Sequence, residues 1–175
     1  MKTNVLALVA LTLTLTASAF ADDRPTAPFR AEHVEVKEHL GHIDAMIGSL
    51  PTAPAASQRQ TMTMVANFLH EHIRKHAEWE EAKLYPAVDR RTHEGKYPFT
   101  ASMRYEHRIV GRGIDDLAAR AKAETIDAVA FARAADRLVG LIQAHFEEEE
   151  EVLLPILDAT MTQEEFAKEL GELAH

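Results

Sequence analysis

The feature that most constrains this chain is a motif that occurs twice. Residues 76–86 and 145–155 both read H-x-E-x-E-E-x-x-L-x-P. A Glu-His pair precedes each copy. The pair ending at His39 lies 37 residues before the first copy begins, and the pair ending at His107 lies 38 residues before the second. Self-similarity at this scale indicates repeated structural units, so we predict two helix pairs of the same design.

Helical periodicity dominates the chain around these motifs. Apolar residues recur at steps of three and four in segments 36–50, 65–84, 103–117 and 131–153, which places them on one face of each helix. The inward face of the first segment is expected to carry Val36, His39, Ile43, Met46 and Leu50. No alternating pattern typical of a strand is present.

Prolines and capping residues indicate where the helices begin and end. Pro86 is expected to bend or end the second helix, and residues 89–97 form the clearest loop. The fourth helix is expected to begin at an N-cap Thr125 and to end near Pro155.

A short last helix is predicted at the C-terminus. Thr162 is followed three residues later by Glu165, which is the pattern of a capping box, and it opens a helix over residues 163–173. Four long helices with modest connections bury their apolar faces most simply as a bundle. We therefore predict an all-α fold, an up-down-up-down four-helix bundle with a short C-terminal helix.

Residues 1–21 have the composition of a secretory signal peptide. Lys2 precedes an apolar stretch with interleaved Thr over residues 5–16, and Ala-Ser-Ala and Ala-Phe-Ala cleavage patterns follow it. The apolar stretch is shorter than the roughly 20 residues needed to span a bilayer. We expect a loose N-terminal arm over residues 22–29 and one domain over residues 30–175, in a periplasmic or secreted protein with no membrane attachment in its mature form.

Composition excludes several kinds of site and partner. The chain has no Cys, which excludes disulfides, iron–sulfur clusters and thiolate zinc sites. With 28 acidic against 19 basic residues, its formal net charge is −9, and no basic stripe is present to bind a phosphate backbone. We therefore expect no nucleic-acid partner.

The two motifs place His and Glu on the inward faces of their helices. Four residues turn a helix through about 400°, so His76 stacks over Glu80 and His145 stacks over Glu149. Burying such groups without a partner costs several kcal/mol per charge. A cation makes this interior tolerable, and the donor set suits iron, manganese, zinc or copper rather than calcium or magnesium.

Six inward-facing donors are more than one ion needs. The predicted metal ligands are His39, His76, Glu80, His107, His145 and Glu149. Two carboxylates that can bridge, with two His for each ion, indicate a dinuclear site, and other two-metal sites hold their ions roughly 3.5 to 4 Å apart. His33 and His42 compete with His39 on the first helix, but only His39 combines the Glu-His step with the 37-residue interval.

The pattern H…HxxxE…H…HxxxE resembles the hemerythrin-type, or HHE cation-binding, domain, a family of non-haem di-iron four-helix bundles. The resemblance covers roughly residues 30–157 and implies iron at the six ligands named above, with Glu80 and Glu149 bridging two ions. It also implies a protein that binds or senses a small molecule such as dioxygen or nitric oxide.

The chain departs from the oxygen-carrying members of that family at two places. Those members have a second His one turn after the His of the third helix, where this chain has Gly111, and they use H-x-x-x-x-D where it has Glu149 and Glu150. The missing imidazole leaves more open coordination, which permits chemistry with nitric oxide or peroxide. Two alternatives therefore stay open: a di-iron oxidase or peroxidase-type protective enzyme, and a zinc- or copper-binding scavenger. A binding protein is favoured over an enzyme.

Other residues flank the predicted site. Trp79 and Tyr85 border the first motif and can wall its pocket. His72 lies one turn before that motif and is a candidate for an outer contact. Tyr105 lies two residues before His107 and is a candidate hydrogen-bond donor to a bound ligand.

Overall fold

The computed structural model describes residues 22–92 and 97–171, and these residues form helices without a β-strand. The all-α prediction is therefore confirmed for the described part of the chain. The predicted signal peptide, residues 1–21, lies outside the described residues. None of the described helices is long and apolar enough to cross a membrane.

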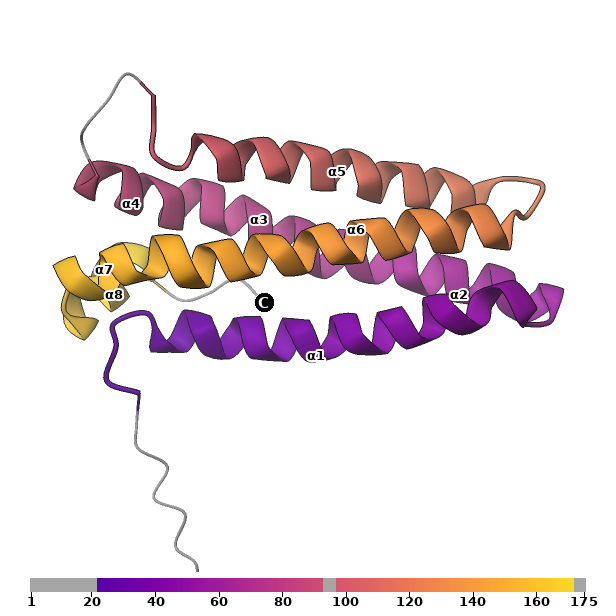
Figure 1. The fold of residues 1–175 in the computed structure, drawn as a ribbon, viewed down its shortest axis with the longest axis horizontal. Coiled ribbons are helices and arrows are strands. Elements are labelled where there is room, and N and C mark those ends of the chain that lie inside the picture. Colours follow the sequence, from indigo (N-terminus) through magenta and orange to yellow (C-terminus); the bar gives the residue numbers. More distant parts are fainter. Residues whose placement is uncertain (1–21, 93–96, 172–175) are drawn as a thin grey trace, which may run out of the picture.

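Four long helical rods lie side by side, and a short helix follows them (Figure 1). In chain order the elements are α1 (Ala27–Ser49) and η1 (Leu50–Thr52); α2 (Ala55–Phe68), η2 (Leu69–Ile73), α3 (Arg74–Trp79), η3 (Glu80–Leu84) and α4 (Tyr85–Arg91); α5 (Ala101–Lys122); α6 (Ala128–Glu148), η4 (Glu149–Leu153) and α7 (Leu154–Thr160); and α8 (Gln163–Leu170). α5 packs against both α2 and α6, and α1 packs against α6. Each rod can therefore turn one face toward a common interior.

Wide π-helical turns interrupt the second and fourth rods at equivalent places. η3 begins at Glu80 and η4 begins at Glu149, the same position in the two copies of the motif. Such turns are rare in proteins, and those that occur are often part of a functional site. Beyond them the rods do not end at Pro86 or near Pro155, because each proline lies in the first turn of the next helical segment, where no N–H is needed.

Two helix starts differ from the sequence-based expectation. α1 begins at Ala27, inside the segment 22–29 predicted to be a loose arm, because Phe29 is fully buried and anchors this turn in the interior. α6 is capped by Asp127 rather than by Thr125, since the Asp127 side chain accepts a hydrogen bond from the Ala130 amide at 2.9 Å.

The capping box at the last helix is confirmed. Thr162 accepts a hydrogen bond from the Glu165 amide, and the Glu165 carboxylate accepts one from the Thr162 amide. The helix ends at Leu170 rather than at residue 173 as predicted, because Gly171 adopts a left-handed φ of 73° that stops it. Its buried Phe166 and Leu170 attach it to the end of the bundle that carries α4 and α7.

The interior contains two apolar clusters with a polar layer between them. The larger cluster fills the space between α1, α2, α5 and α6, and the smaller one lies among α4, α7 and α8. Each long rod passes from one cluster to the other across buried polar residues. On α5, for example, His107 lies between Met103 of the smaller cluster and Val110 of the larger one.

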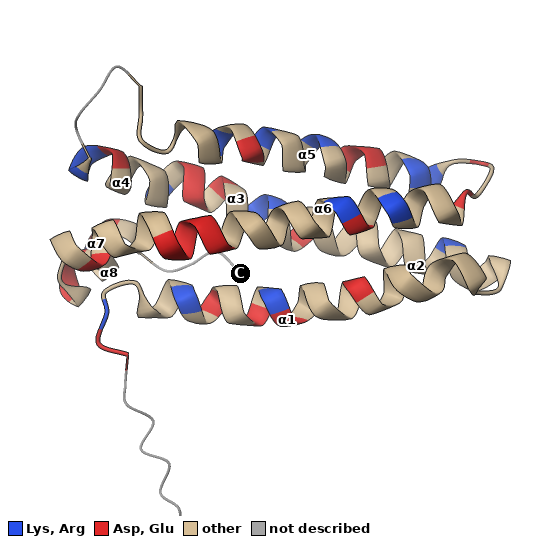
Figure 2. Ribbon diagram, in the orientation of Figure 1, with Lys and Arg blue, Asp and Glu red and all other residues tan. Residues whose placement is uncertain are grey.

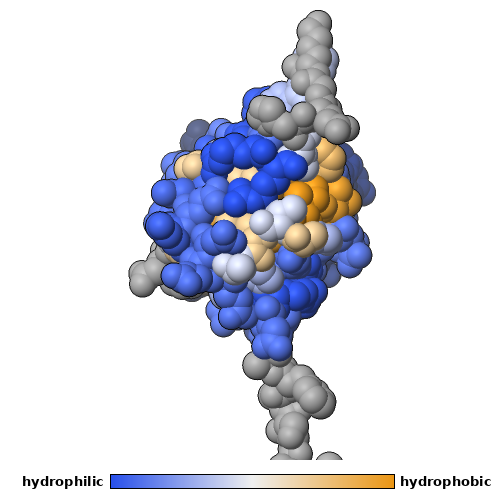
Figure 3. Space-filling view, turned by 90° about the vertical axis from the view of Figure 1, so that its left-hand side faces the viewer, coloured by the Kyte–Doolittle hydropathy of each residue, from blue (hydrophilic) through white to orange (hydrophobic). Residues whose placement is uncertain are grey.

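Charged residues of both signs are distributed along all four rods (Figure 2). Acidic residues follow one another along the end of α6 and η4, where the sequence has five consecutive Glu over residues 147–151. Of this run only Glu149 is fully buried. The end of the molecule on the left of Figure 1 is mostly hydrophilic, with one apolar patch (Figure 3).

A duplicated hydrogen-bonded clamp joins the first half of the chain to the second. The buried Thr26 donates its amide and its hydroxyl to Asp158 Oδ1 at 3.0 and 2.8 Å. Arg30 donates to Asp158 Oδ2 at 3.2 Å and to the Thr26 hydroxyl at 3.1 Å. The start of α1 is thereby tied to α7.

The second clamp repeats the first with the halves exchanged. Thr100 donates its amide and hydroxyl to the two Asp89 oxygens, each at 3.0 Å, and Arg104 donates to Asp89 Oδ2 at 3.3 Å. The start of α5 is thereby tied to α4. Together the two clamps fix where α1 and α5 lie along their neighbours.

Removing either aspartate is expected to destabilise the fold. Asp158→Ala and Asp89→Ala each leave a part-buried Thr amide, Thr hydroxyl and guanidinium without their acceptor, so each lowers the free energy of unfolding by about 2 kcal/mol in urea denaturation. Asp116→Ala, which removes an exposed partner of Arg120, is the control and changes stability little. Equal losses in all three variants would contradict the clamp.

Candidate metal centre

The polar layer between the two apolar clusters is a cluster of His and Glu side chains. Atoms able to bind a metal form two groups, and within each group they lie within 4.8 Å of one another. The first group is His33, His76, Glu80 and Glu149, and the second is Glu80, His107, His145 and Glu149. Both glutamates belong to both groups, so they lie where they can bridge two positions.

The histidines meet in pairs through their inner ring nitrogens. Nε2 of His33 lies 3.1 Å from Nε2 of His76, and Nε2 of His107 lies 3.0 Å from Nε2 of His145. The first pair joins α1 to α3, and the second joins α5 to α6. Each pair therefore aims two nitrogens at one point.

Each central carboxylate reaches both histidine pairs. Glu80 lies 2.7 Å from His76 Nε2 through Oε1 and 3.1 Å from His107 Nε2 through Oε2. Glu149 lies 3.5 Å from His33 Nε2 through Oε2 and 3.7 Å from His145 Nε2 through Oε1. The predicted stacking of His over Glu at a step of four thus brings these groups together.

A carboxylate outside the cluster holds the outer nitrogen of every ring. The Nδ1–carboxylate pairs are His33–Glu150 at 3.0 Å, His76–Glu32 at 3.1 Å, His107–Glu81 at 3.1 Å and His145–Glu106 at 2.8 Å. A neutral imidazole that donates from Nδ1 presents the lone pair of Nε2 to the centre, which is how metal-binding histidines are oriented. All four rings are therefore set for coordination.

His39, predicted as the ligand of the first helix, does not lie in this cluster. The structure places it on the exposed side of α1, with its ring 5.8 Å from the ring of Phe68. His33 takes the position instead and is fully buried. The buried stripe of α1 runs through Phe29, His33, Leu40, Ile43 and Ile47, and position 39 lies one step away from it.

The repeat interval predicts the wrong histidine because the two halves of the chain do not have equal spacing between their paired histidines. His33 precedes His76 by 43 residues, whereas His107 precedes His145 by 38, because the first helix pair is longer and includes η1. A signal for His33 was available in the sequence. Residues 26–33 and 100–107 both read T-A-x-x-R-x-E-H, so Glu32-His33 is the true counterpart of Glu106-His107.

The other flanking residues divide into those that reach the site and those that do not. His42 and His72 are exposed, and the His72 ring lies against Phe68 rather than against the cluster. Tyr105 is 53% exposed, which does not fit the expected contact with a bound ligand. Trp79 stacks on Phe29 beside the site, and Tyr85 lies within it.

The pKa values of the two central carboxylates are shifted in opposite directions. Burial opposes ionisation of Glu80, but His76, His107 and His33 outweigh it and hold the pKa of Glu80 well below its usual range. Burial together with the negative charge of Glu80 raises the pKa of Glu149 well above its usual range. Without a cation, the pair therefore shares one negative charge.

Burial and neighbouring charges also shift the pKa values of two of the rings. Burial lowers the pKa of His76, but Glu80 and Glu32 outweigh burial and raise it to about 10. Burial lowers the pKa of His145, aided by His107. The cluster thus stabilises a positive charge on the His76 ring, where a metal ion would otherwise supply the charge.

The central carboxylates can bind a metal because three of their four oxygens accept no well-aligned hydrogen bond. Both oxygens of Glu80 and the Oε2 atom of Glu149 are buried and accept no well-aligned hydrogen bond, although ring nitrogens of His76, His107 and His33 lie 2.7 to 3.5 Å away. A buried carboxylate oxygen that accepts no hydrogen bond lowers the stability of the fold, and such oxygens are uncommon in native structures. Imidazole nitrogens and carboxylate oxygens converging on these atoms form a donor set for iron, manganese, zinc or copper.

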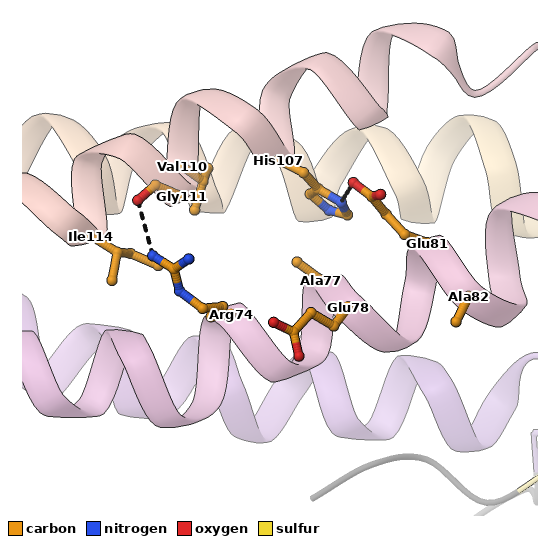
Figure 4. A pocket seen from close by; sticks show the side chains of 9 residues that line it. All are labelled: Arg74, Ala77, Glu78, Glu81, Ala82, His107, Val110, Gly111 and Ile114. Carbon is orange, nitrogen blue, oxygen red and sulfur yellow. Dashed lines mark hydrogen bonds and ion pairs between the residues drawn. The ribbon is translucent and has the colours of Figure 1, made fainter.

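A pocket of about 440 Å³ lies beside the second histidine pair (Figure 4). It opens between α5 and the α3–η3 segment, with His107 and Glu81 at one end and Arg74 at the other. Gly111 is part of its wall, and a Cβ added there would meet nothing within 4 Å. The position that carries a second His in oxygen-carrying relatives is therefore open space in this chain.

This fold and this donor set define a class: all-helical proteins that hold metal with His and Glu in a buried layer. The model of the hemerythrin HHE cation-binding domain matches residues 24–157, and the chain belongs to this family. The family predicted from the sequence is therefore confirmed. Neither curated proteins nor solved structures give a significant match to the chain.

Exchanging the two candidate histidines of α1 tests the site directly. His33→Ala removes one donor from the first group, so we expect bound metal per chain to fall by about half in elemental analysis. His39→Ala alters only an exposed ring and should leave the metal content unchanged. The reverse pattern would restore the assignment made from the repeat interval.

The stability of the metal-free protein should fall as pH rises. The pKa of His76 is raised from 6.5 to about 10, so its protonated ring stabilises the fold fully below pH 6.5, and that stability is lost as pH rises toward about 10. Metal binding displaces the same proton, so the extra stability that metal gives should grow over this interval. Melting temperatures with chelator and with excess metal measure both trends, and a chelated protein that gains stability with pH would contradict them.

Proposed function

We propose that the chain is an exported hemerythrin-like protein that holds a non-haem di-iron centre and binds or senses a small ligand, such as dioxygen or nitric oxide, at that centre. One observation carries the proposal: two four-donor groups share both of their carboxylates. Shared carboxylates are what a closely spaced metal pair requires. The proposal includes an up-down-up-down order of the four rods and a periplasmic or secreted location.

Different residues would hold the two ions of such a centre. His33 and His76 would hold one ion, His107 and His145 the other, and the two central glutamates would bridge them. The bound iron pair would supply the coordination chemistry that captures the small ligand. The outer carboxylates fix the rings, and the apolar clusters on both sides exclude water from the layer.

The space around the site favours a small ligand over a large substrate. An interior void of about 10 Å³ lies among the ring and carboxylate groups of the centre. It shares Ala77, His107 and Val110 with the outer pocket, so those three residues separate the centre from the pocket. A diatomic molecule is of the size that such a wall can admit when side chains move.

Metal loading tests the proposal. We expect two irons per chain, measured by elemental analysis, and a higher melting temperature than in chelator-treated protein, because each ion binds only the folded state. The double variant Glu80→Gln/Glu149→Gln should lose both effects. Glu147→Gln, an exposed member of the same acidic run, should keep them.

Optical spectra under argon, under air and with nitric oxide then test the ligand. A spectrum of the iron-loaded protein that changes with either gas supports the proposal. Zinc or copper in protein purified from its native compartment, with no iron, would favour the scavenger alternative. Catalytic turnover of peroxide would favour the enzyme alternative.

A further inference from the structure

Tyr85 breaks the two-fold pattern of the site. Residues 76–86 align with 145–155, so its counterpart is Leu154, an apolar residue of the smaller cluster. Both side chains are fully buried. The four histidines, the two central glutamates and the four outer carboxylates all have counterparts, so the phenol is a polar group that only one side of the centre possesses.

The phenol oxygen lies among the donors of the second group. It donates a hydrogen bond to Glu149 Oε1 at 2.7 Å, and it lies 3.0 Å from His107 Nε2 and 3.4 Å from His145 Nε2. Neighbouring ligands of one ion, with bonds of about 2.1 Å at right angles, lie about 3 Å apart. The oxygen is thus at ligand spacing from three donors of this group.

Neighbouring side chains fix the orientation of the Tyr85 ring. It stacks on His107 with centroids 5.2 Å apart, and the Arg104 guanidinium lies 5.2 Å from its centroid. Arg104 is itself held by the Thr100–Asp89 clamp. The ring is therefore placed by a side chain of the site and by a cation that the clamp holds.

We propose that Tyr85 is a metal ligand, binding through its phenolate oxygen to the ion held by Glu80, His107, His145 and Glu149. This inference rests on the proposed function. On binding, the O–H bond breaks, its proton leaves to solvent and an iron–oxygen bond forms, with no change in oxidation state. One ion thereby has five protein ligands and the other four, so the open coordination for a small ligand lies mainly at the ion held by His33 and His76.

The test is the spectrum of the ferric protein. Wild-type protein is loaded with iron(II) under argon, desalted and oxidised with ferricyanide. A phenolate bound to iron(III) gives a visible charge-transfer band, and excitation into it enhances tyrosine ring vibrations in the resonance Raman spectrum. We expect both signals in wild type and in the control Tyr105→Phe, which alters an exposed tyrosine, and neither in Tyr85→Phe.

Metal release gives a second measurement. In Tyr85→Phe one of the two irons should leave to a chelator about tenfold faster than in wild type, while the other leaves at the wild-type rate. Tyr105→Phe should release both at wild-type rates. Equal release of both irons from Tyr85→Phe and from wild type would overturn the inference.

The possible outcomes distinguish a failure of this inference from a failure of the proposed function on which it rests. Wild-type protein that takes up no iron refutes the proposed function. Wild-type protein with two irons but no phenolate band overturns the Tyr85 assignment and leaves the di-iron proposal standing. If Tyr85→Phe does not fold, wild-type protein grown with ring-deuterated tyrosine decides the matter, because the enhanced Raman modes must shift on deuteration if a tyrosine is bound.

Discussion

The fold depends on how one buried polar layer is satisfied. Four imidazoles and two carboxylates lie between two apolar clusters, and every long rod contributes to the layer. Apolar burial alone would press the rods together at this level and leave the carboxylate oxygens without partners. The rods can pack here because the rings, the outer carboxylates and, in the proposed function, two cations offset the cost of burying charge.

The arrangement outside the layer explains how it keeps its geometry. The outer carboxylates orient the four rings, and two clamps, Thr26–Asp158 and Thr100–Asp89, fix the starts of α1 and α5. In each clamp the aspartate comes from the opposite half of the chain, as do the Glu81 and Glu150 that hold His107 and His33. The halves are therefore interlocked at both levels, and changes in one half alter the position of donors in the other.

The two halves of the duplicated site are not identical. Tyr85 and Leu154 occupy equivalent positions, yet only the phenol reaches the donors. On the same side of the centre, Gly111 leaves open space in the pocket wall. A site built from two copies of one motif thus has one polar, ligand-rich side, and the likeness of its halves would not predict that difference.

The sequence by itself determined the fold class and most of the donor set. The period of the apolar residues gave the helices, and a step of four between His and Glu places both on one helix face whatever surrounds them, so five of the six predicted ligands meet in the cluster. Local spacing could not show which histidine of the first helix faces the cluster. Both Glu32-His33 and Glu38-His39 offer a Glu-His step, and the 37-residue interval pointed to the wrong one.

Only the tertiary structure decided which histidine of α1 faces inward. That choice depends on how far the first helix pair runs before it turns and on how the Thr26 clamp fixes α1 along its neighbours. The same holds for the partners of each ring and for the nearness of Tyr85 to Glu149, which lies 64 residues away in the chain. Local spacing fixes the face of a helix on which a residue lies, but its level in the bundle is set by packing between segments far apart in sequence.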